Sequence, residues 1–334
     1  MNKRLFGTLP CGTKIAIFTL THGKSSAEIM TYGAAIVSLR PFGNVDVVGG
    51  YDCIEDYLAD TSNQGAIIGR VANRIEGACF KMDNKVYHLV DNDNGNCLHG
   101  GGGFHQKVWQ VNAYTQNSVT LSYYSPDGED GFPAGLPVCV KYTLEDSALC
   151  IDYTAKPEGK TPIALTNHAY FNLDGFGKDI RKHKIQIAAE RYTEVDERLI
   201  PNGNRPPVAS TSLDYRKSRL IDDGTDAFTG YDHNMILSPT SFRSFHGVSL
   251  GLAAQAENDR LTLQVYTDQP GLQFYTGNFL GDGPCFKNGV PPIQYGAFCL
   301  EAQTEPNCIK KGIAIYDKGT TYSQHTVYKF NKLG

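Results

Sequence analysis

Residues 138–153 read Val-Cys-Val-Lys-Tyr-Thr-Leu-Glu-Asp-Ser-Ala-Leu-Cys-Ile-Asp-Tyr, and this stretch indicates the class of fold. Apolar side chains occupy every second position of residues 138–144, and the same alternation resumes in 149–153 after the polar residues 145–147. A period of two places alternate side chains on opposite faces of a strand. Two such runs joined by a short polar segment are typical of an antiparallel β-hairpin.

Short alternating runs also dominate the rest of the chain. We predict further strands at 14–20, 27–39 (with a bend at Tyr32-Gly33), 119–123, 184–189 and 261–267. Only two segments, 54–58 and 248–256, are weak helix candidates, and the second fits a strand equally well. The proline-rich segment 201–207 is expected to be a loop.

No internal repeat, low-complexity linker or break in composition divides the sequence into two parts. Many short strands at regular spacing are typical of a β-sandwich. We therefore predict an all-β protein in which residues 1–334 form a single large antiparallel β-sandwich domain.

The bulk composition favours a globular protein with a neutral partner. The 334 residues are 41% hydrophobic and 11% aromatic, which is enough for a sizeable core. Lysine and arginine total 31 against 35 acidic residues, giving a formal charge of −4 without a long run of either sign. This balance argues against nucleic acid or an anionic membrane as the main partner, so we expect a neutral or nearly neutral substrate.

The termini and the cysteines bear on localisation. Residues 1–10 lack the apolar stretch of a signal peptide, and no segment of about 18 apolar residues occurs. The nine cysteines show no Cys-x-x-Cys spacing, and no His-Glu-x-x-His is present. We therefore expect a cytoplasmic protein with reduced, mostly buried thiols, without a membrane span and without a zinc site.

Residues 165–173, Leu-Thr-Asn-His-Ala-Tyr-Phe-Asn-Leu, contain the first candidate for chemistry. If they form a strand, Thr166, His168 and Tyr170 share one face, and His168 has a hydroxyl on either side. Histidine titrates close to neutral pH, so His168 is a candidate for proton transfer. A buried histidine that only satisfies local hydrogen bonds fits this stretch equally well.

Residues 69–77 place two polar side chains, Asn73 and Arg74, between small or apolar neighbours. Arg74 could donate a fork of hydrogen bonds to hydroxyls or to an oxygen that gathers negative charge. The alternative is an ordinary surface ion pair with Glu76.

Residues 97–109 contain four consecutive glycines directly after His99, a second candidate imidazole. Neither Gly-Lys-Ser/Thr nor a complete Gly-x-Gly-x-x-Gly is present, so a phosphate loop is not indicated. We interpret the glycines as a place where the backbone turns sharply or approaches a ligand. Trp109, the only tryptophan, could stack on a ligand ring, but it fits the core better.

Three polar residues of the C-terminal half are further candidates. Asp232 offers a carboxylate to ligand hydroxyls, although a loop aspartate that caps its own backbone would look the same. Gln273 lies on the polar face of the alternating segment 269–280. In segment 298–307, Glu301 and Gln303 share one face of an expected strand, and Leu300 and Ala302 share the other. If the first face opens into a cleft, partial desolvation would raise the pKa of Glu301 and make it a better base, unless it is half of a structural ion pair.

Together these stretches resemble the aldose 1-epimerase family, the galactose mutarotases. The matching motifs lie in order along nearly the whole chain: Asn-Arg at 73–74, Leu-His-Gly-Gly at 98–101, Thr-Asn-His-x-Tyr-Phe-Asn-Leu at 166–173, Tyr-Asp-His at 231–233, Gln-Pro-Gly-x-Gln-x-Tyr-Thr-Gly-Asn at 269–278 and Leu-Glu-x-Gln-x-x-Pro at 300–306. The family often has proline after the base and aspartate after the later proline, where this chain has Ala302 and Asn307.

The resemblance implies a galactose-mutarotase-like β-supersandwich that interconverts the α and β anomers of free hexoses such as D-galactose and D-glucose. It implies that Glu301 is the general base and His168 the general acid. The implied substrate-binding set is Asn73, Arg74, His99, Asp232 and Gln273. The expected partner is a monosaccharide, no metal or cofactor is required, and we expect a monomer or a weak dimer. Activity should then fall on the acid side as Glu301 protonates and on the alkaline side as His168 deprotonates.

Three other functions fit the same pattern less well. A glycoside hydrolase needs two carboxylates ~5–5.5 Å or ~6.5–9.5 Å apart, and no motif supplies Glu301 with an acidic partner. A catalytically silent sugar-binding or regulatory protein would not need both proton-transfer groups. An epimerase of hexose 6-phosphates should show an additional basic cluster, and none lies near the motifs.

Overall fold

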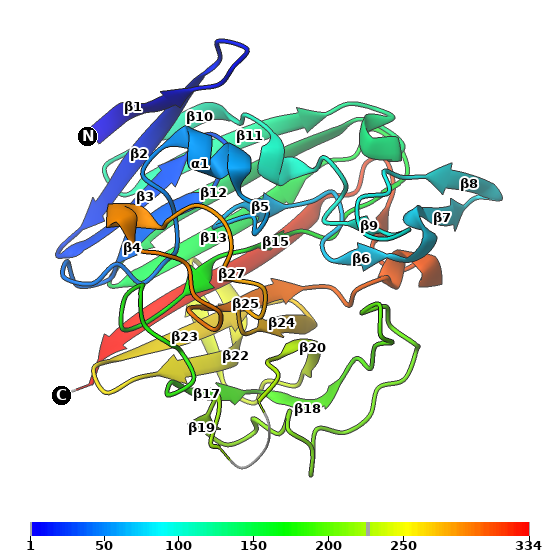
Figure 1. The fold of residues 1–334 in the computed structure, drawn as a ribbon. Helices are drawn as coiled ribbons and strands as arrows, with labels where there is room; N and C mark the ends of the chain where they lie inside the picture. Colours follow the sequence, from blue (N-terminus) through cyan, green and yellow to red (C-terminus); the bar gives the residue numbers. More distant parts are fainter. Residues whose placement is uncertain (1, 225–227, 334) are drawn as a thin grey trace.

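The computed structural model describes residues 2–224 and 228–333, and three antiparallel β-sheets are its main layers (Figure 1). The largest sheet has ten strands in the order β10-β11-β12-β13-β27-β23-β22-β17-β19, with β21 paired to β22. Its strands are β10 (Gln110–Tyr114), β11 (Ser118–Ser125), β12 (Leu136–Glu145), β13 (Ala148–Ala155), β17 (Lys184–Ile187), β19 (Arg219–Leu220), β21 (Phe242–Phe245), β22 (Val248–Glu257), β23 (Leu261–Thr267) and β27 (Tyr322–Lys332).

Two smaller sheets lie against this one. A four-stranded sheet consists, in order, of β1 (Asn2–Thr8), β2 (Lys14–His22), β3 (Ser25–Met30) and β4 (Ile36–Arg40). A five-stranded sheet has the order β16 (Tyr170–Phe171), β25 (Phe298–Gln303), β24 (Gly271–Tyr275), β20 (Asp232–Leu237) and β18 (Ala189–Tyr192).

Short elements complete the described chain. Four two-stranded pairs are β5 (Ile67–Ile68) with β15 (Thr166–Asn167), β6 (Arg74–Ile75) with β9 (Cys97–Leu98), β7 (Cys79–Met82) with β8 (Lys85–His88), and β14 (Thr161–Pro162) with β26 (Ile315–Tyr316). The helices are α1 (Ile54–Ala59) and the 3₁₀ turns η1 (Glu76–Ala78), η2 (Phe104–Gln106), η3 (Glu129–Gly131), η4 (Lys287–Gly289) and η5 (Cys308–Lys311). No helix within 2–224 or 228–333 is long and apolar enough to cross a membrane.

One large apolar core joins the three sheets. Val138 and Val140 of the ten-stranded sheet are buried in the same cluster as Ile29 of β3 and Phe274 of β24. Both smaller sheets therefore pack against one face of the ten-stranded sheet, and each fully buried side chain of this size contributes about 1.5–3 kcal/mol. Trp109 belongs to this core, where its Nε1 donates to the carbonyl of Phe104 at 3.2 Å. The predicted all-β antiparallel sandwich is confirmed.

Several local predictions are also confirmed. The alternating stretch 138–153 forms the β12–β13 hairpin, and its turn residues Asp146 and Ser147 have φ of 39° and 60°. Segment 54–58 lies within α1, and 27–39 is divided by a bend between β3 and β4.

Two segments differ from a simple reading of the sequence. Segment 248–256 is strand β22, so its helical interpretation is wrong. Segment 184–189 is not one strand, because β17 ends at Ile187 in the ten-stranded sheet and β18 begins at Ala189 in the five-stranded sheet. Between them Ala188 donates to the carbonyl of Ala253 at 2.8 Å and accepts from the amide of Ser238 at 2.7 Å, which anchors the crossing between the two sheets.

Candidate active site

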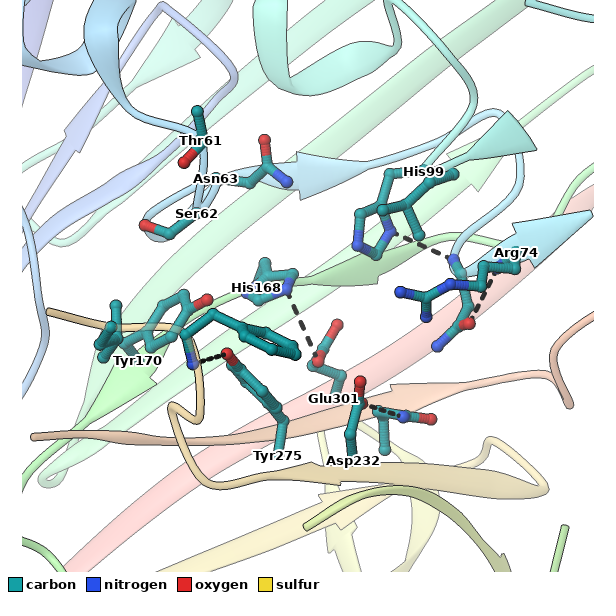
Figure 2. A pocket seen from close by; sticks show the side chains of 15 residues that line it. Thr61, Ser62, Asn63, Arg74, His99, His168, Tyr170, Asp232, Tyr275 and Glu301 are labelled. Atoms are coloured by element: carbon teal, nitrogen blue, oxygen red, sulfur yellow. Dashed lines mark hydrogen bonds and ion pairs between the residues drawn. The ribbon is translucent and has the colours of Figure 1, made fainter. Parts of the chain in front are cut away.

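A pocket lies on the face of the five-stranded sheet that is turned away from the core (Figure 2). Its lining includes all seven site residues predicted from the sequence: Asn73, Arg74, His99, His168, Asp232, Gln273 and Glu301. The chain therefore brings together groups that lie up to 228 positions apart, from 73 to 301.

Strand alternation explains how the sheet supplies the pocket floor. On β24, Leu272 and Phe274 point into the core, whereas Gln273 and Tyr275 line the pocket. Glu301 of β25 is the direct partner of Gln273 in the antiparallel ladder, so the two side chains lie next to each other on the pocket face.

His168 lies at a break in a strand. The stretch 165–173 forms β15 and β16 with His168 between them, so the condition of one continuous strand is not met. The amide of His168 donates to the carbonyl of Ala66 and its carbonyl accepts from the amide of Gly65, both at 2.9 Å. Both polar backbone groups at the break are thus satisfied by the segment before β5, which holds the histidine in place.

The break also changes which neighbours face the pocket. The side chain of Tyr170 lines it and stacks on the His168 ring, with ring centroids 5.0 Å apart. Thr166 does not line it, because its hydroxyl donates to the buried carbonyl of Ala302 at 2.8 Å. The prediction of a hydroxyl on either side of His168 is therefore wrong for Thr166.

The imidazole of His168 lies between two protein groups. Its Nε2 is 3.8 Å from Oε1 of Glu301, a contact drawn as a dashed line in Figure 2, and its Nδ1 is 3.7 Å from Sγ of Cys299. The sequence reasoning missed Cys299. The spacing in the sequence could have indicated Cys299, because it lies two positions before Glu301 and so shares its strand face.

Burial dominates the electrostatics of this pair. The side chains of His168 and Glu301 are 8% and 4% exposed. Burial raises the pKa of the Glu301 carboxyl well above its usual value, and the nearby carboxylate of Asp232 raises it further. Burial lowers the pKa of His168 to about 4. In the substrate-free pocket both groups are therefore driven toward their neutral forms.

His99 and Asn73 hold each other across the β6–β9 pair. The amide of Asn73 donates to Nδ1 of His99 at 3.2 Å, and the amide of His99 donates to the carbonyl of Asn73 at 3.2 Å. Burial, followed by the charge of His168, lowers the pKa of His99 well below its ordinary value. A neutral ring whose Nδ1 accepts must have its proton on Nε2, so His99 is a fixed hydrogen-bond donor.

Arg74 is anchored at one edge of its guanidinium. Its Nε donates to Oδ2 of Asp93 at 2.8 Å, so the alternative of an ion pair with Glu76 is wrong. The guanidinium extends into the pocket (Figure 2). Asn307, one of the two departures from the family pattern, donates its amide to the carbonyl of Arg74 and so supports the strand that presents this arginine.

Asp232 is held by an amide network behind the pocket. Gln273 donates Nε2 to Oδ1 of Asp232 at 2.6 Å, and its Oε1 accepts from Nε2 of Gln303 at 3.2 Å. Asp232 lies within β20, so it does not cap a loop. Burial raises the pKa of Asp232, whereas the bond from Gln273 and the charge of Arg74 lower it.

The structure adds pocket residues that no motif indicated. Thr61, Ser62 and Asn63 follow α1 and form the wall opposite Glu301 (Figure 2). Asp60 fixes this loop by accepting the amide of Ser62 at 2.8 Å and that of Gln64 at 2.9 Å. The remaining lining residues are Phe279 and Leu280, which also lie outside the motifs, and Leu98, Tyr170 and Tyr275, which lie within them.

Two pocket residues and the buried Cys299 form a set that is able to ligate a metal ion. His168, Cys299 and Glu301 each offer one ligand atom, and these atoms lie within 4.8 Å of one another. Acid–base chemistry on a neutral hydroxyl needs only the imidazole and the carboxylate of this set.

Comparison with known proteins identifies the family. The sequence matches the aldose 1-epimerase family over residues 16–329. The chain belongs to the aldose 1-epimerase family. It is 38% identical to the galactose mutarotase of Homo sapiens over 343 residues, covering 99% of this chain and 98% of that protein.

Other members of the family agree with this assignment. The chain is 33% identical to the aldose 1-epimerase of Escherichia coli (strain K12) over 345 residues, or 96% of each protein. The crystal structure of galactose 1-epimerase from Lactobacillus acidophilus NCFM has the same fold, with a TM-score of 0.87 at 24% identity over 100% of this chain and 99% of that one. The predicted galactose-mutarotase-like β-supersandwich is confirmed.

Proposed function

We propose that this chain is an aldose 1-epimerase that interconverts the α and β anomers of free hexoses such as D-galactose and D-glucose. Membership of the family supports the reaction, and the observation that supports the assignment of groups is the buried pair of His168 and Glu301. The ring oxygen and the anomeric hydroxyl of an aldopyranose are bonded to the same carbon. An acid and a base 3.8 Å apart can exchange protons with these two neighbouring oxygens in the same step.

The reaction moves two protons in opposite directions. Glu301 takes the proton of the anomeric hydroxyl while the imidazolium of His168 gives a proton to the ring oxygen, and the C1–O5 bond breaks. The aldehyde then turns about the C1–C2 bond. Reclosure on its other face returns both protons, so each group acts once as acid and once as base.

Burial of the pair favours this exchange. When the sugar ring is closed the pair is an ion pair, and when the sugar is open Glu301 and His168 are both neutral. The pocket favours the neutral forms, because desolvation raises the pKa of Glu301 and lowers that of His168. Burial therefore lowers the free energy of the open-aldehyde complex relative to the closed-sugar complex, in which the proton of Glu301 has first passed to His168.

Fixed neighbours hold the sugar during these steps. His99 donates from Nε2, and Arg74 donates from the amino groups of its guanidinium to oxygens that gather charge. Asp232, held by Gln273, accepts from sugar hydroxyls, and Asn73 can donate its side-chain amide because its Oδ1 already accepts the amide of Arg74 at 2.8 Å.

Polarimetry on freshly dissolved α-D-galactose and α-D-glucose tests the proposal. We expect the wild type to accelerate the return to the equilibrium rotation, and Glu301→Gln and His168→Asn each to lose ~10²–10⁴-fold in kcat. Lys184→Gln, a change at an exposed position, is the matched control and should retain full activity. Unchanged acceleration in either pocket variant would contradict the assigned roles.

The same experiment separates the alternatives. The pocket contains a second carboxylate, Asp232, which the sequence motifs had not indicated as a partner of Glu301. Release of reducing sugar from an oligosaccharide would therefore favour a glycoside hydrolase. Sugar binding without any acceleration would favour a catalytically silent binding or regulatory protein.

We also propose the setting in which the enzyme works. Residues 1–334 act as one catalytic domain, a proposal supported by the contribution of both halves of the chain to one pocket. All nine cysteines are free thiols, which supports a reducing compartment such as the cytoplasm. A monomer or weak dimer is supported by the spread of exposed large apolar side chains over many elements, and sedimentation at several concentrations tests it.

A further inference from the structure

A second cluster of metal-ligating side chains lies outside the pocket, where two hairpin turns meet. Glu145 is the last residue of β12, Cys150 lies on β13, and His246 lies in the turn between β21 and β22. A carboxylate oxygen, a thiol sulfur and an imidazole nitrogen from these residues lie within 4.8 Å of one another. None of the three is used by the proposed epimerase.

The fold brings these residues together by turning one hairpin over the large sheet. Val248 and Leu250 have their backbone partners on β21, and the pairing of β22 with β23 begins only at Gly251. The free end of the hairpin packs on the sheet face opposite the core, where Phe245 and Leu250 join the apolar cluster that contains Cys150. Cys150 is therefore buried, and its thiol is directed toward the meeting point of the turns.

Both turns are short and well defined. Asp146 and Ser147 have φ of 39° and 60°, and His246 and Gly247 have φ of 49° and 83°. Two-residue hairpin turns with positive φ at both positions are the type that matches the twist of the flanking strands. Glu145 and His246 are thus presented by rigid backbone and not by long loops.

We propose that Glu145, Cys150 and His246 bind Zn²⁺ and thereby join the two hairpins. Sγ of Cys150 and Oε1 of Glu145 are 3.7 Å apart. Tetrahedral zinc with bonds of ~2.3 Å to sulfur and ~2.1 Å to oxygen requires a separation of about 3.6 Å. Nε2 of His246 contacts Oε1 of Glu145 directly, and both side chains are exposed enough to separate around an ion.

The charges and ligand types also suit zinc. Binding displaces the thiol proton of Cys150 to solvent, and the resulting thiolate and the carboxylate of Glu145 balance the two positive charges. One sulfur, one nitrogen and one oxygen ligand select a borderline-soft ion, whereas Mg²⁺ and Ca²⁺ prefer oxygen ligands alone. A water molecule would complete the fourth position.

Calorimetric titration of the metal-free full chain with Zn²⁺ tests this site, with Mg²⁺ as the comparison ion. We expect Cys150→Ser and His246→Asn to weaken Zn²⁺ binding at least ~100-fold, because even loss of an outer-shell partner commonly costs 10–100-fold. The matched control is Cys139→Ser, which removes a thiol of β12 that is not part of the cluster. Cys299→Ser is included because the pocket contains its own potential ligands.

Two further readouts separate a folding defect from loss of a ligand. Thermal unfolding with and without Zn²⁺ should show a metal-dependent rise in Tm for the wild type and Cys139→Ser, and none for Cys150→Ser. Replacement of Zn²⁺ by Co²⁺ should give a thiolate-to-metal charge-transfer band that disappears in Cys150→Ser. The proposal would be overturned if the zinc affinity were unchanged in Cys150→Ser, or if it were lost only in Cys299→Ser. The epimerase activity of Cys150→Ser should equal that of the wild type.

Discussion

The number of protons that His168 and Glu301 hold together determines the two limbs of the pH profile. The sequence alone predicts that Glu301 protonates on the acid side and that His168 deprotonates on the alkaline side. In the folded pocket the pKa of Glu301 is raised well above its usual value and that of His168 is lowered to about 4. The active pair holds one proton, and its two titrations therefore belong to the pair.

We expect a bell-shaped profile of kcat/KM with an acid limb near pH 4. As the pH falls, the pair binds a second proton, so that His168 is charged but Glu301 is protonated and cannot act as a base. As the pH rises, the pair loses its only proton, so that no acid remains. Because burial favours neutral groups, the acid limb lies below the ordinary pKa of histidine and the alkaline limb lies above that of glutamic acid. Polarimetric rates from about pH 4 to pH 9 check this, and an acid limb near 6.5 would contradict it.

Cys299 positions the imidazole without adding charge. Its Sγ is 3.7 Å from Nδ1 of His168, and burial raises the thiol pKa well above its usual value, so the sulfur is a neutral partner. We expect Cys299→Ala to lower kcat about 10–10²-fold through loss of ring orientation, with little change in KM. Cys299→Ser, which keeps a small polar group, should recover most of the rate. Steady-state kinetics of both variants measure these changes. An equal loss of kcat in Cys299→Ser and Cys299→Ala would argue that Cys299 has a packing role alone.

At the scale of elements, the alternation of apolar and polar residues predicts the strands and strand faces that the local sequence determines. The β12–β13 hairpin, strand β23 and the shared face of Gln273 and Tyr275 follow directly from the spacing of apolar residues. The break at His168 does not, because Gly65 and Ala66, which hold its backbone, lie about a hundred residues earlier. The family resemblance named seven of the residues that line the pocket. The loop at Thr61–Asn63 has no distinctive spacing in the sequence, and Asp60 fixes its position in the fold.

The segment between β5 and β6, which contains Asn73 and leads directly to Arg74, depends on the buried Arg70. Arg70 is 2% exposed, and its guanidinium donates to the carbonyls of Pro133 and Ala134 at 2.7 and 2.9 Å and to the hydroxyl of Ser125 at 2.7 Å. Burial lowers the pKa of Arg70 to about 10. Ser125 is buried, and Pro133 and Ala134 are partly buried, so the guanidinium satisfies acceptors of three segments and fixes the element behind the pocket.

We expect Arg70→Met to reduce the free energy of unfolding by about 3 kcal/mol or more, because the buried hydroxyls of Ser125 and Thr161 and two partly buried carbonyls lose their donor. Urea denaturation measures the change, with Arg243→Met on the exposed strand β21 as the control, which should stay within about 0.5 kcal/mol of the wild type. A loss of less than 1 kcal/mol for Arg70→Met would show that the acceptors find other partners.

At the scale of the whole molecule, charge indicates which sugars can be substrates. The formal net charge is −4, and the pocket is lined by two carboxylates, Asp232 and Glu301, against one guanidinium, Arg74, which already pairs with Asp93. Burial lowers the pKa values of His168 and His99, so neither adds a lasting positive charge. Such a pocket has no excess of positive charge with which to attract or bind a phosphate.

We therefore expect kcat/KM for α-D-glucose to change less than about twofold between ~0.01 M and ~0.15 M ionic strength, because a neutral sugar is not steered by the field of the protein. For α-D-glucose 6-phosphate at the lower ionic strength, kcat/KM should be at least ~10-fold lower, since like charges across a binding site cost several kcal/mol. Because salt screens the repulsion, the difference in kcat/KM between the two sugars should become smaller as the ionic strength rises. Equal turnover of the two sugars, or a rate for the phosphate that falls with salt, would instead indicate a cationic subsite and would favour an epimerase of sugar phosphates.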